Sequence, residues 1–248
     1  MIPHRLAPLR RGGHVALGIG GIEAWASLHR ESAGAAHASS VLNVRRIAAA
    51  SRELGIHTLT LYALPPRLWD HSPARLTEAL AAWTAWLRAE ATALRAGGTR
   101  LTVIGRRDRL PSRLHATIRR AEVLTAPGRR ARLRLAIDYS ARRAFERARS
   151  LLERGGPGCT FDEALAQAIH DVEPTRPVDL VVLTGGEEEP DDALFWEFAY
   201  APVVRTGTLW PDFDPATLRA ILGRTLASDT PSVRGRDPAP LAMGAPAP

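Results

Sequence analysis

The stretch that constrains the fold most is residues 14–26, with the sequence HVALGIGGIEAWA. Its first six residues are largely apolar, and Gly20 and Gly21 follow at once. An apolar run that ends in two glycines predicts a buried strand that enters a tight turn, with Trp25 on the helix or loop beyond it. In an open α/β sheet, a ligand crevice forms at the carboxyl ends of the strands. We therefore expect the binding site to be built around this turn.

Strand patterns and helix patterns alternate along the rest of the chain. Short apolar runs predict further strands at residues 57–63, 101–104, 133–137 and 180–183. Apolar residues at helical spacing predict helices at 38–54, 73–96, 111–124, 140–154, 161–171 and 215–227. Residues 27–37 are small and polar, which predicts a loop. This alternation indicates an α/β fold with a central, mostly parallel sheet flanked by helices.

Length and composition favour a single domain. The chain has 248 residues, enough for one sizeable core. We expect a flexible arm at 1–13, the folded domain at 14–227 and a disordered tail at 228–248. We find no apolar run near the roughly 20 residues that cross a bilayer, and no apolar segment of a secretory signal at the start. Cys159 is the one cysteine, which excludes an internal disulfide, so we expect a cytoplasmic protein.

The charge of the chain is strongly basic. The net charge is +7, and all 33 basic residues are arginine. A basic surface can contact nucleic acid or an anionic membrane face. The arginines lie at mixed helical spacings, for instance Arg142, Arg143, Arg147 and Arg149, which is typical of solvated helix faces. No zinc finger or RNA-binding aromatic pattern accompanies them, so we expect no nucleic-acid partner.

Several motifs occur in an order that matches one known family. They are HVALGIGGIEAWA at 14–26, HTLTLYA at 57–63, AIDYSAR at 136–142, DLVVLTGGE at 179–187 and LWPDF at 209–213. In order and spacing they resemble the motifs of the cis-prenyltransferases, the undecaprenyl diphosphate synthase family. The resemblance covers nearly all of residues 14–227.

The resemblance implies a fold in which an apolar tunnel runs between the long helices and the sheet and takes the growing isoprenoid chain. Helix 73–97 would be one wall of that tunnel. Trp83 and Trp86 lie three residues apart on it, which predicts core packing. If they face the tunnel instead, they would shorten it and favour a small prenyl chain.

The chain departs from the family at the residues that bind metal and diphosphate. Gly20 stands at the position of the metal-binding aspartate, Pro202 at that of a second acidic residue, and Leu183 at that of a diphosphate-binding arginine. Other family positions are changed as well, and the residues found there are Ile22, Ala24, Ala33, His71, Glu189 and Asp191. A carboxylate-bound magnesium ion and paired arginines are what stabilise a leaving diphosphate. We therefore expect no standard chain elongation by this chain alone.

Some positions of the family site are retained. His37 stands at the family's loop histidine, and Glu187 at the glutamate of the Gly-Gly-Glu turn. The substrate-binding candidates are Gly20, Gly21, Ile22, Trp25, His37, Trp69, His71, Trp83, Trp86 and Glu187.

An acidic run, EEEPDD, occupies residues 187–192. One interpretation is a solvated first helical turn, because proline and acidic residues suit a helix N-terminus. The other is a rebuilt metal site in which Glu188, Asp191 and Asp192 bind magnesium, which could in turn bind diphosphate. The sequence names no other cofactor.

Aromatic residues gather near the carboxyl end of the domain. Such a cluster predicts an exposed apolar patch and hence a dimer interface. The interface candidates are Trp196, Tyr200, Trp210 and Phe213. The partner is a second copy or an intact homologue.

Two functions are consistent with these observations. The first is a non-catalytic subunit that pairs with an active cis-prenyltransferase. The second is a repurposed isoprenoid enzyme, such as a terpene cyclase or a prenyl transferase to a non-diphosphate acceptor. In both, the ligand is a prenyl diphosphate or an isoprenoid chain.

Overall fold

The structure is a computed structural model of the chain that describes residues 13–154, 160–172, 175–186 and 201–227. The arm predicted at 1–13 and the tail predicted at 228–248 lie outside these ranges, apart from Gly13, and stay predictions. Within the described ranges, every helix is too short or too polar to span a membrane.

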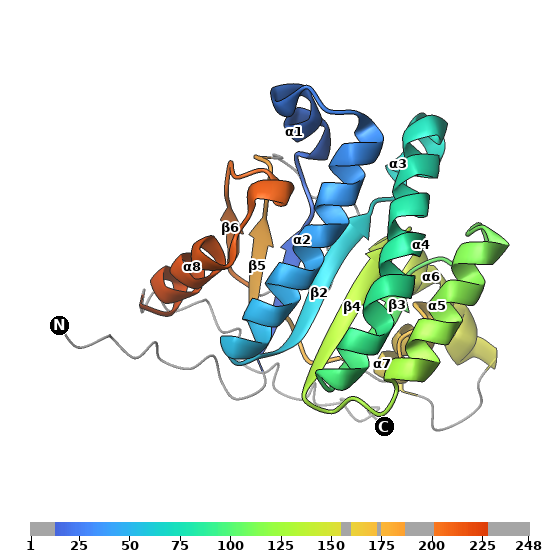
Figure 1. Cartoon of the computed structure of the whole chain (residues 1–248). Helices are drawn as coiled ribbons and strands as arrows, with labels where there is room; N and C mark the ends of the chain where they lie inside the picture. Colours follow the sequence, from blue (N-terminus) through green and yellow to red (C-terminus); the bar gives the residue numbers. More distant parts are fainter. Residues whose placement is uncertain (1–12, 155–159, 173–174, 187–200, 228–248) are drawn as a thin grey trace, which may run out of the picture.

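A six-stranded sheet forms the centre of the described part (Figure 1). The strands are β1 (Gly13–Gly18), β2 (Ile56–Leu64), β3 (Thr99–Ile104), β4 (Ala131–Ile137), β5 (Leu180–Leu183) and β6 (Val203–Arg205). Their order is β3-β4-β2-β1-β5-β6, and every neighbouring pair runs parallel. This confirms the predicted parallel α/β sheet. The sequence does not predict β6, because three partly exposed residues carry no strand pattern.

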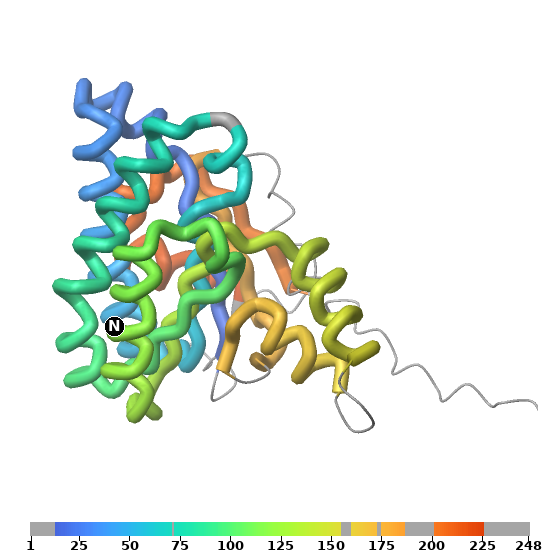
Figure 2. The backbone as a smooth tube through the Cα atoms, turned by 90° about the vertical axis from the view of Figure 1, so that its right-hand side faces the viewer, coloured from blue at the N-terminus to red at the C-terminus, as the bar shows by residue number. Residues whose placement is uncertain are grey.

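Helices cover both faces of the sheet. The helices are α1 (Ile22–His29), α2 (Ala33–Glu53), α3 (Arg67–His71), α4 (Pro73–Ala96), α5 (Ser112–Thr125), α6 (Ala141–Arg154), α7 (Phe161–Ala168) and α8 (Pro215–Ala227), with a 3-10 turn, η2, at Trp210–Asp212. α2, α4 and α5 pack side by side on one face, and α6 and α7 lie together on the other (Figures 1 and 2). Because the strands are parallel, the loops that follow them meet at one edge of the sheet.

The loop predicted at residues 27–37 is wrong. α1 runs to His29, and α2 already begins at Ala33. Ser32 caps α2, with its hydroxyl oxygen accepting a hydrogen bond from the Ala35 N–H at 3.1 Å. The first turn of α2 consists of small residues, which pack closely but give no hydrophobic periodicity in the sequence.

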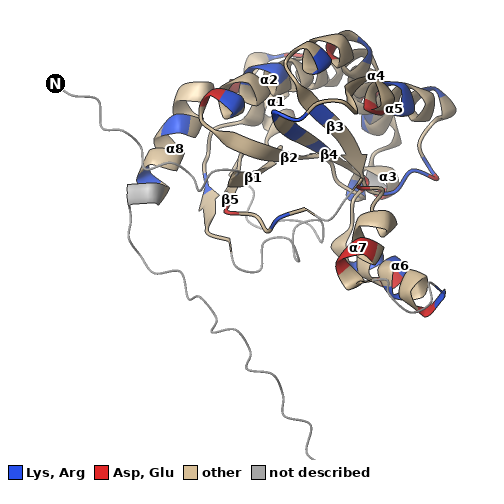
Figure 3. Ribbon diagram, turned by 90° about the horizontal axis from the view of Figure 1, so that it is seen from below, with Lys and Arg blue, Asp and Glu red and all other residues tan. Residues whose placement is uncertain are grey.

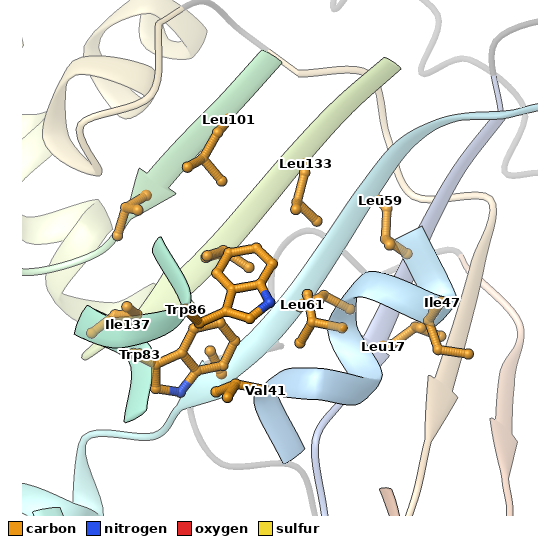
Figure 4. Packing of buried hydrophobic residues seen from close by; sticks show 14 of the residues in the cluster. Leu17, Val41, Ile47, Leu59, Leu61, Trp83, Trp86, Leu101, Leu133 and Ile137 are labelled. Carbon is orange, nitrogen blue, oxygen red and sulfur yellow. The ribbon is translucent and has the colours of Figure 1, made fainter. Parts of the chain in front are cut away.

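The larger core lies between the sheet and α2 and α4 (Figure 4). Trp83 and Trp86 extend from α4 into this core, with exposed fractions of 2% and 4% and ring centroids 5.6 Å apart in an edge-to-face arrangement. The predicted core packing of the pair is confirmed. Val41 and Leu61 lie nearby in the same cluster. The two indole rings therefore occupy space between α4 and the sheet, where the resemblance implies a tunnel.

Trp210 and Phe213 also belong to this core. Both are fully buried within the chain, and their rings stack with centroids 6.0 Å apart. The Trp210 Nε1–H donates to the Ser40 carbonyl at 2.9 Å, and the Asn43 side-chain amide donates to the carbonyls of Trp210 and Phe213. Their assignment to an exposed dimer patch is therefore wrong. Aromatic residues that lie close together in the sequence can form either an exposed patch or part of the core, and the sequence alone does not tell which.

A buried ionic network joins β4 to the segment after α7. The side chains of Arg134 and Asp171 are each 1% exposed, and Arg134 Nε donates to Asp171 Oδ2 at 2.9 Å. Arg132 donates to the other carboxylate oxygen at 3.0 Å. Arg134 also donates to the Thr60 hydroxyl, which lies 2.8 Å from Nε2 of His14. The network therefore extends across β4, β2 and β1. Figure 3 shows basic residues in the sheet on β3 and β4.

The Asp171→Asn variant should lose about 3–5 kcal/mol of unfolding free energy, because Arg134 keeps a buried charge without its carboxylate. Urea denaturation measures this loss. Glu153→Gln is the control, since the Arg149–Glu153 pair is exposed on α6 and should contribute less than about 1 kcal/mol. Equal losses in the two variants would contradict the expectation.

Candidate functional site

The site rests on a hydrogen-bonded junction between the ends of β1 and β5. The Thr184 hydroxyl donates to the Gly18 carbonyl at 2.7 Å and accepts from the Gly20 N–H at 3.0 Å. The Gly20 carbonyl accepts from the Trp210 N–H at 3.0 Å. Both backbone groups of Gly20 are therefore satisfied, and the turn that leads into α1 is fixed to the neighbouring strand.

Two glycines allow the turns after β1 and β5 to touch. Gly21 has a φ of 76° and Gly185 a φ of 81°, both in the left-handed region that favours glycine. A Cβ at Gly185 would lie 2.4 Å from the carbonyl carbon of Gly20 and 2.4 Å from the nitrogen of Gly21. The predicted tight turn at Gly20 and Gly21 is confirmed, and its close partner is the turn at Gly185.

A cavity of about 410 Å³, which we call the β1 cavity, opens beside this junction. Its walls come from the segments after β1, β2 and β5, from the start of α2 and from the start of α4. The lining residues are Ile19, Gly21, Ile22, Glu23, Ala24, His37, Ala63, Leu64, Pro65, Arg67, Leu68, Arg75 and Gly185. The structure thus brings the predicted site residues Gly21, Ile22 and His37 together, with Gly20 in the adjoining turn.

The charged side chains of the β1 cavity come from different elements. Arg75 of α4 forms an ion pair with Glu23 of α1, and Arg67 of α3 also lines the wall. Burial lowers the pKa of His37 from its ordinary value of 6.5, although Glu78 and Glu23 act in the opposite direction. The imidazole is therefore mostly neutral at pH 7. The groups of the cavity that can face an anion are therefore two guanidinium groups, of which that of Arg75 is already paired with Glu23, and a neutral imidazole.

Trp25 and Trp69 lie near the β1 cavity, but neither lines it. The Trp25 Nε1–H donates to the Asp212 carboxylate at 2.9 Å, and the Trp25 ring stacks on His29. The guanidinium of Arg109 lies over the Trp69 ring, 5.2 Å from its centroid. In this structure both tryptophans hold neighbouring parts of the protein in place, and their assignment as substrate contacts stays a prediction.

Several predicted site residues lie outside the described residues. They are the substrate candidate Glu187, the metal candidates Glu188, Asp191 and Asp192, and the interface candidates Trp196 and Tyr200. His71 is the last residue of α3. The assignments of all these residues, His71 included, stay predictions.

The described residues of the β1 cavity do not fit a magnesium site. Magnesium is bound through carboxylate oxygens, and Gly20 offers none at the position where the resemblance implies an aspartate. Glu23 is the one carboxylate among the lining residues, and it is paired with Arg75. Across the part of the chain that the structure describes, no three His, Cys, Asp or Glu side chains gather to hold a metal ion.

The sequence patterns do not single out Glu23, Arg67 or Arg75 as cavity residues. Arg67 follows the turn that ends β2, and Arg75 lies in the first turn of α4. Both follow β2 in the sequence, and residues that follow the carboxyl end of a parallel strand often line a ligand crevice. That position is the one signal in the sequence that could have identified them. In a chain with 33 basic residues that signal is weak.

The fold and the cavity define a class of protein: a parallel α/β domain with an arginine-containing cavity at the carboxyl edge of its sheet. The family model described as "Putative undecaprenyl diphosphate synthase" matches residues 19–225, and the chain belongs to this prenyltransferase family.

Curated relatives are similar over most of the chain. Isoprenyl transferase 1 of Bradyrhizobium diazoefficiens is 38% identical over 209 residues, which are 84% of each protein. The ditrans,polycis-undecaprenyl-diphosphate synthase of Escherichia coli K12, named as specific for (2E,6E)-farnesyl diphosphate, is 34% identical over 207 residues, 81% of each protein.

Solved structures share the fold. Lavandulyl diphosphate synthase from Lavandula x intermedia, solved in complex with dimethylallyl diphosphate, superimposes with a TM-score of 0.79 at 24% identity, covering 88% of this chain and 96% of that one. A probable undecaprenyl diphosphate synthase from Campylobacter jejuni gives a TM-score of 0.69 at 21% identity, covering 87% and 94%.

The Gly185→Ala variant should be strongly destabilised. The left-handed φ costs about 1–2 kcal/mol for alanine, and the overlap with the Gly20–Gly21 backbone adds about 1–3 kcal/mol. Gly186→Ala is the matched control, because its φ of 68° carries the first cost while its Cβ would meet no atom of the described residues closer than 4.0 Å. Thermal denaturation of both variants compares them. Equal melting temperatures would contradict the close contact between the two turns.

Proposed function

We propose that this chain is a prenyltransferase-family protein that does not elongate isoprenoid chains alone and serves as a non-catalytic subunit beside an intact homologue. The observation that carries the proposal is the turn after β1. Gly20 provides no carboxylate there, and its backbone groups are bonded to Thr184 and Trp210. Ionisation of an allylic diphosphate needs its developing charge neutralised, and the described residues of the β1 cavity supply no metal ligand set for that.

Two other departures from the family, at Leu183 and Pro202, also support the proposed loss of chain elongation. Leu183 ends β5 with its side chain 5% exposed and packed in a hydrophobic cluster, at the position where the resemblance implies an arginine. Pro202 is exposed at the position where the resemblance implies an acid. Restoring one residue therefore leaves the remaining losses in place.

A repurposed isoprenoid enzyme is the second candidate. It is favoured by the persistence of the β1 cavity, which keeps Arg67, Arg75 and His37 around apolar Ile19 and Leu68. Guanidinium groups bind diphosphate directly, without a metal. In this second function the cavity binds a prenyl diphosphate and the chemistry differs from standard elongation. The acidic residues Asp191 and Asp192 could add a magnesium site.

The purified protein should form no chain product from farnesyl diphosphate and radiolabelled isopentenyl diphosphate in the presence of magnesium. Gly20→Asp alone should not restore activity. The backbone at Gly20 does not require glycine, because its φ is not among the positive values. Since Gly20 is buried, circular dichroism of the variant is measured first to establish that it folds. Labelled polyprenyl products from protein free of any intact homologue would refute the proposal.

The double variant Arg67→Ala/Arg75→Ala separates the two candidates. Coexpressed with an intact homologue, a non-catalytic subunit should keep the activity of the pair, since its own cavity is not used. The control is Arg88→Ala/Arg95→Ala, two exposed residues farther along α4.

The opposite result favours the repurposed enzyme. In that case the Arg67→Ala/Arg75→Ala protein loses turnover or farnesyl diphosphate binding by about tenfold or more, while the Arg88→Ala/Arg95→Ala protein keeps both. Light scattering of the mixture adds an independent test. If the two proteins stay separate at micromolar concentration, the subunit function is wrong.

A further inference from the structure

A second cavity, of about 450 Å³, opens at the same edge of the sheet beside the ends of β3 and β4. We call it the β3–β4 cavity. It shares no lining residue with the β1 cavity. Its walls come from the loops after β3 and β4, from α6 and from the end of α7, the two helices that lie on the face opposite α4 (Figure 2). The Gly105 N–H donates to the Ile169 carbonyl at 3.0 Å, which ties the end of α7 to the end of β3.

Four of the five arginines of α6 fall into two groups. Arg142 and Arg149 each pair with a glutamate four residues along the same helix, Glu146 at 3.2 Å and Glu153 at 2.9 Å. These two arginines do not line the cavity.

Arg143 and Arg147 form the second group, and both line the cavity. Four residues apart, they lie on one face of the helix. Neither guanidinium has an ion pair or hydrogen bond with any residue in the described ranges. Both arginines are exposed, and two like charges side by side on a cavity wall, with no counter-charge among the described residues, favour a bound anion.

The acids of this cavity are already matched by other arginines. Asp138 is held by two hydrogen bonds from Arg109, at 2.5 and 2.6 Å. Asp108 pairs with Arg106 at 2.6 Å. These carboxylates therefore do not neutralise the charges of Arg143 and Arg147.

Two further wall residues, Arg107 and His170, contribute no unpaired charge. Arg107 lines the cavity and is paired with Glu122, which lies outside it. Burial, together with the positive charges of Arg107, Arg147 and His115, lowers the pKa of His170 to about 4. His170 is thus neutral at pH 7 and can form a hydrogen bond to a ligand.

We propose that the β3–β4 cavity binds a small phosphate- or diphosphate-bearing ligand, held by the guanidinium groups of Arg143 and Arg147. A phosphate group presents several oxygens to two planar guanidinium forks, which suits this pair better than a single carboxylate. Ala144, Ala168 and Ile169 form an apolar part of the wall and leave room for an organic moiety. This inference goes beyond the proposed function, because it concerns a separate cavity.

The test uses titration calorimetry with inorganic diphosphate in the presence of EDTA. The background is the full chain with Arg67→Ala/Arg75→Ala, so that the β1 cavity does not contribute. In that background, Arg143→Gln/Arg147→Gln should weaken diphosphate binding by at least about tenfold. The matched control is Arg142→Gln/Arg149→Gln, which removes the same charge from the same helix and should change the affinity by less than about twofold.

A local readout accompanies the titration. Bound diphosphate should raise the pKa of His170 in an NMR titration, because a nearby negative charge favours the imidazolium. The rise should occur in the Arg142→Gln/Arg149→Gln protein and be absent in the Arg143→Gln/Arg147→Gln protein. Circular dichroism checks that both variants fold.

Further ligands identify the source of the phosphate group. Tighter binding of farnesyl diphosphate than of inorganic diphosphate would support an isoprenoid ligand, and equal affinities would support recognition of the anion alone.

Equal diphosphate affinities in the two α6 variants would overturn the proposal. A change of oligomeric mass in Arg143→Gln/Arg147→Gln without diphosphate binding to either variant would also overturn it, and would make the cavity an interface between copies. If the β1 cavity does not bind diphosphate, the Arg67→Ala/Arg75→Ala protein gives the same isotherm as the wild type. That result concerns the β1 cavity alone, and the comparison of the two α6 variants still tests the β3–β4 cavity.

Discussion

The candidate site depends on the hydroxyl of Thr184. It donates to the carbonyl of Gly18 and accepts from the N–H of Gly20. One side chain therefore joins the ends of β1 and β5 at the point where their backbone pairing stops. Gly185 then lies against the Gly20–Gly21 backbone, at a distance that any side chain would prevent. The position of α1, and with it one wall of the β1 cavity, follows from this contact.

Arg109 connects the two cavities of the sheet edge. It binds Asp138 through two hydrogen bonds, and Asp138 lines the β3–β4 cavity. The same guanidinium lies over Trp69 of α3, and the neighbouring Leu68 lines the β1 cavity. The two cavities are thus linked through the contacts of Arg109, although they share no lining residue.

The chain retains the scaffold of its family, and the proposed function is that the chemistry of the site is altered. The resemblance implies a carboxylate at Gly20, and the structure places there a backbone turn with no side chain. Cationic residues remain in the β1 cavity, but Glu23 engages one of them, Arg75. Substrate binding and metal-assisted ionisation are separable tasks. In the proposed function, the described residues of the β1 cavity serve the first task, and they do not supply a metal ligand set for the second.

The sequence alone determined the parallel α/β fold and the glycine turn, because strand runs, helical spacing and glycine pairs are local patterns. It also determined that Gly20 carries no metal ligand. It could not determine that Trp210 folds inward, since burial depends on the hydrogen bonds that Ser40 and Asn43 make across the chain. Likewise, only the tertiary structure separates Arg143 and Arg147 from the paired arginines of α6. Which arginine faces a cavity is decided by the packing of α6 beside the ends of distant strands.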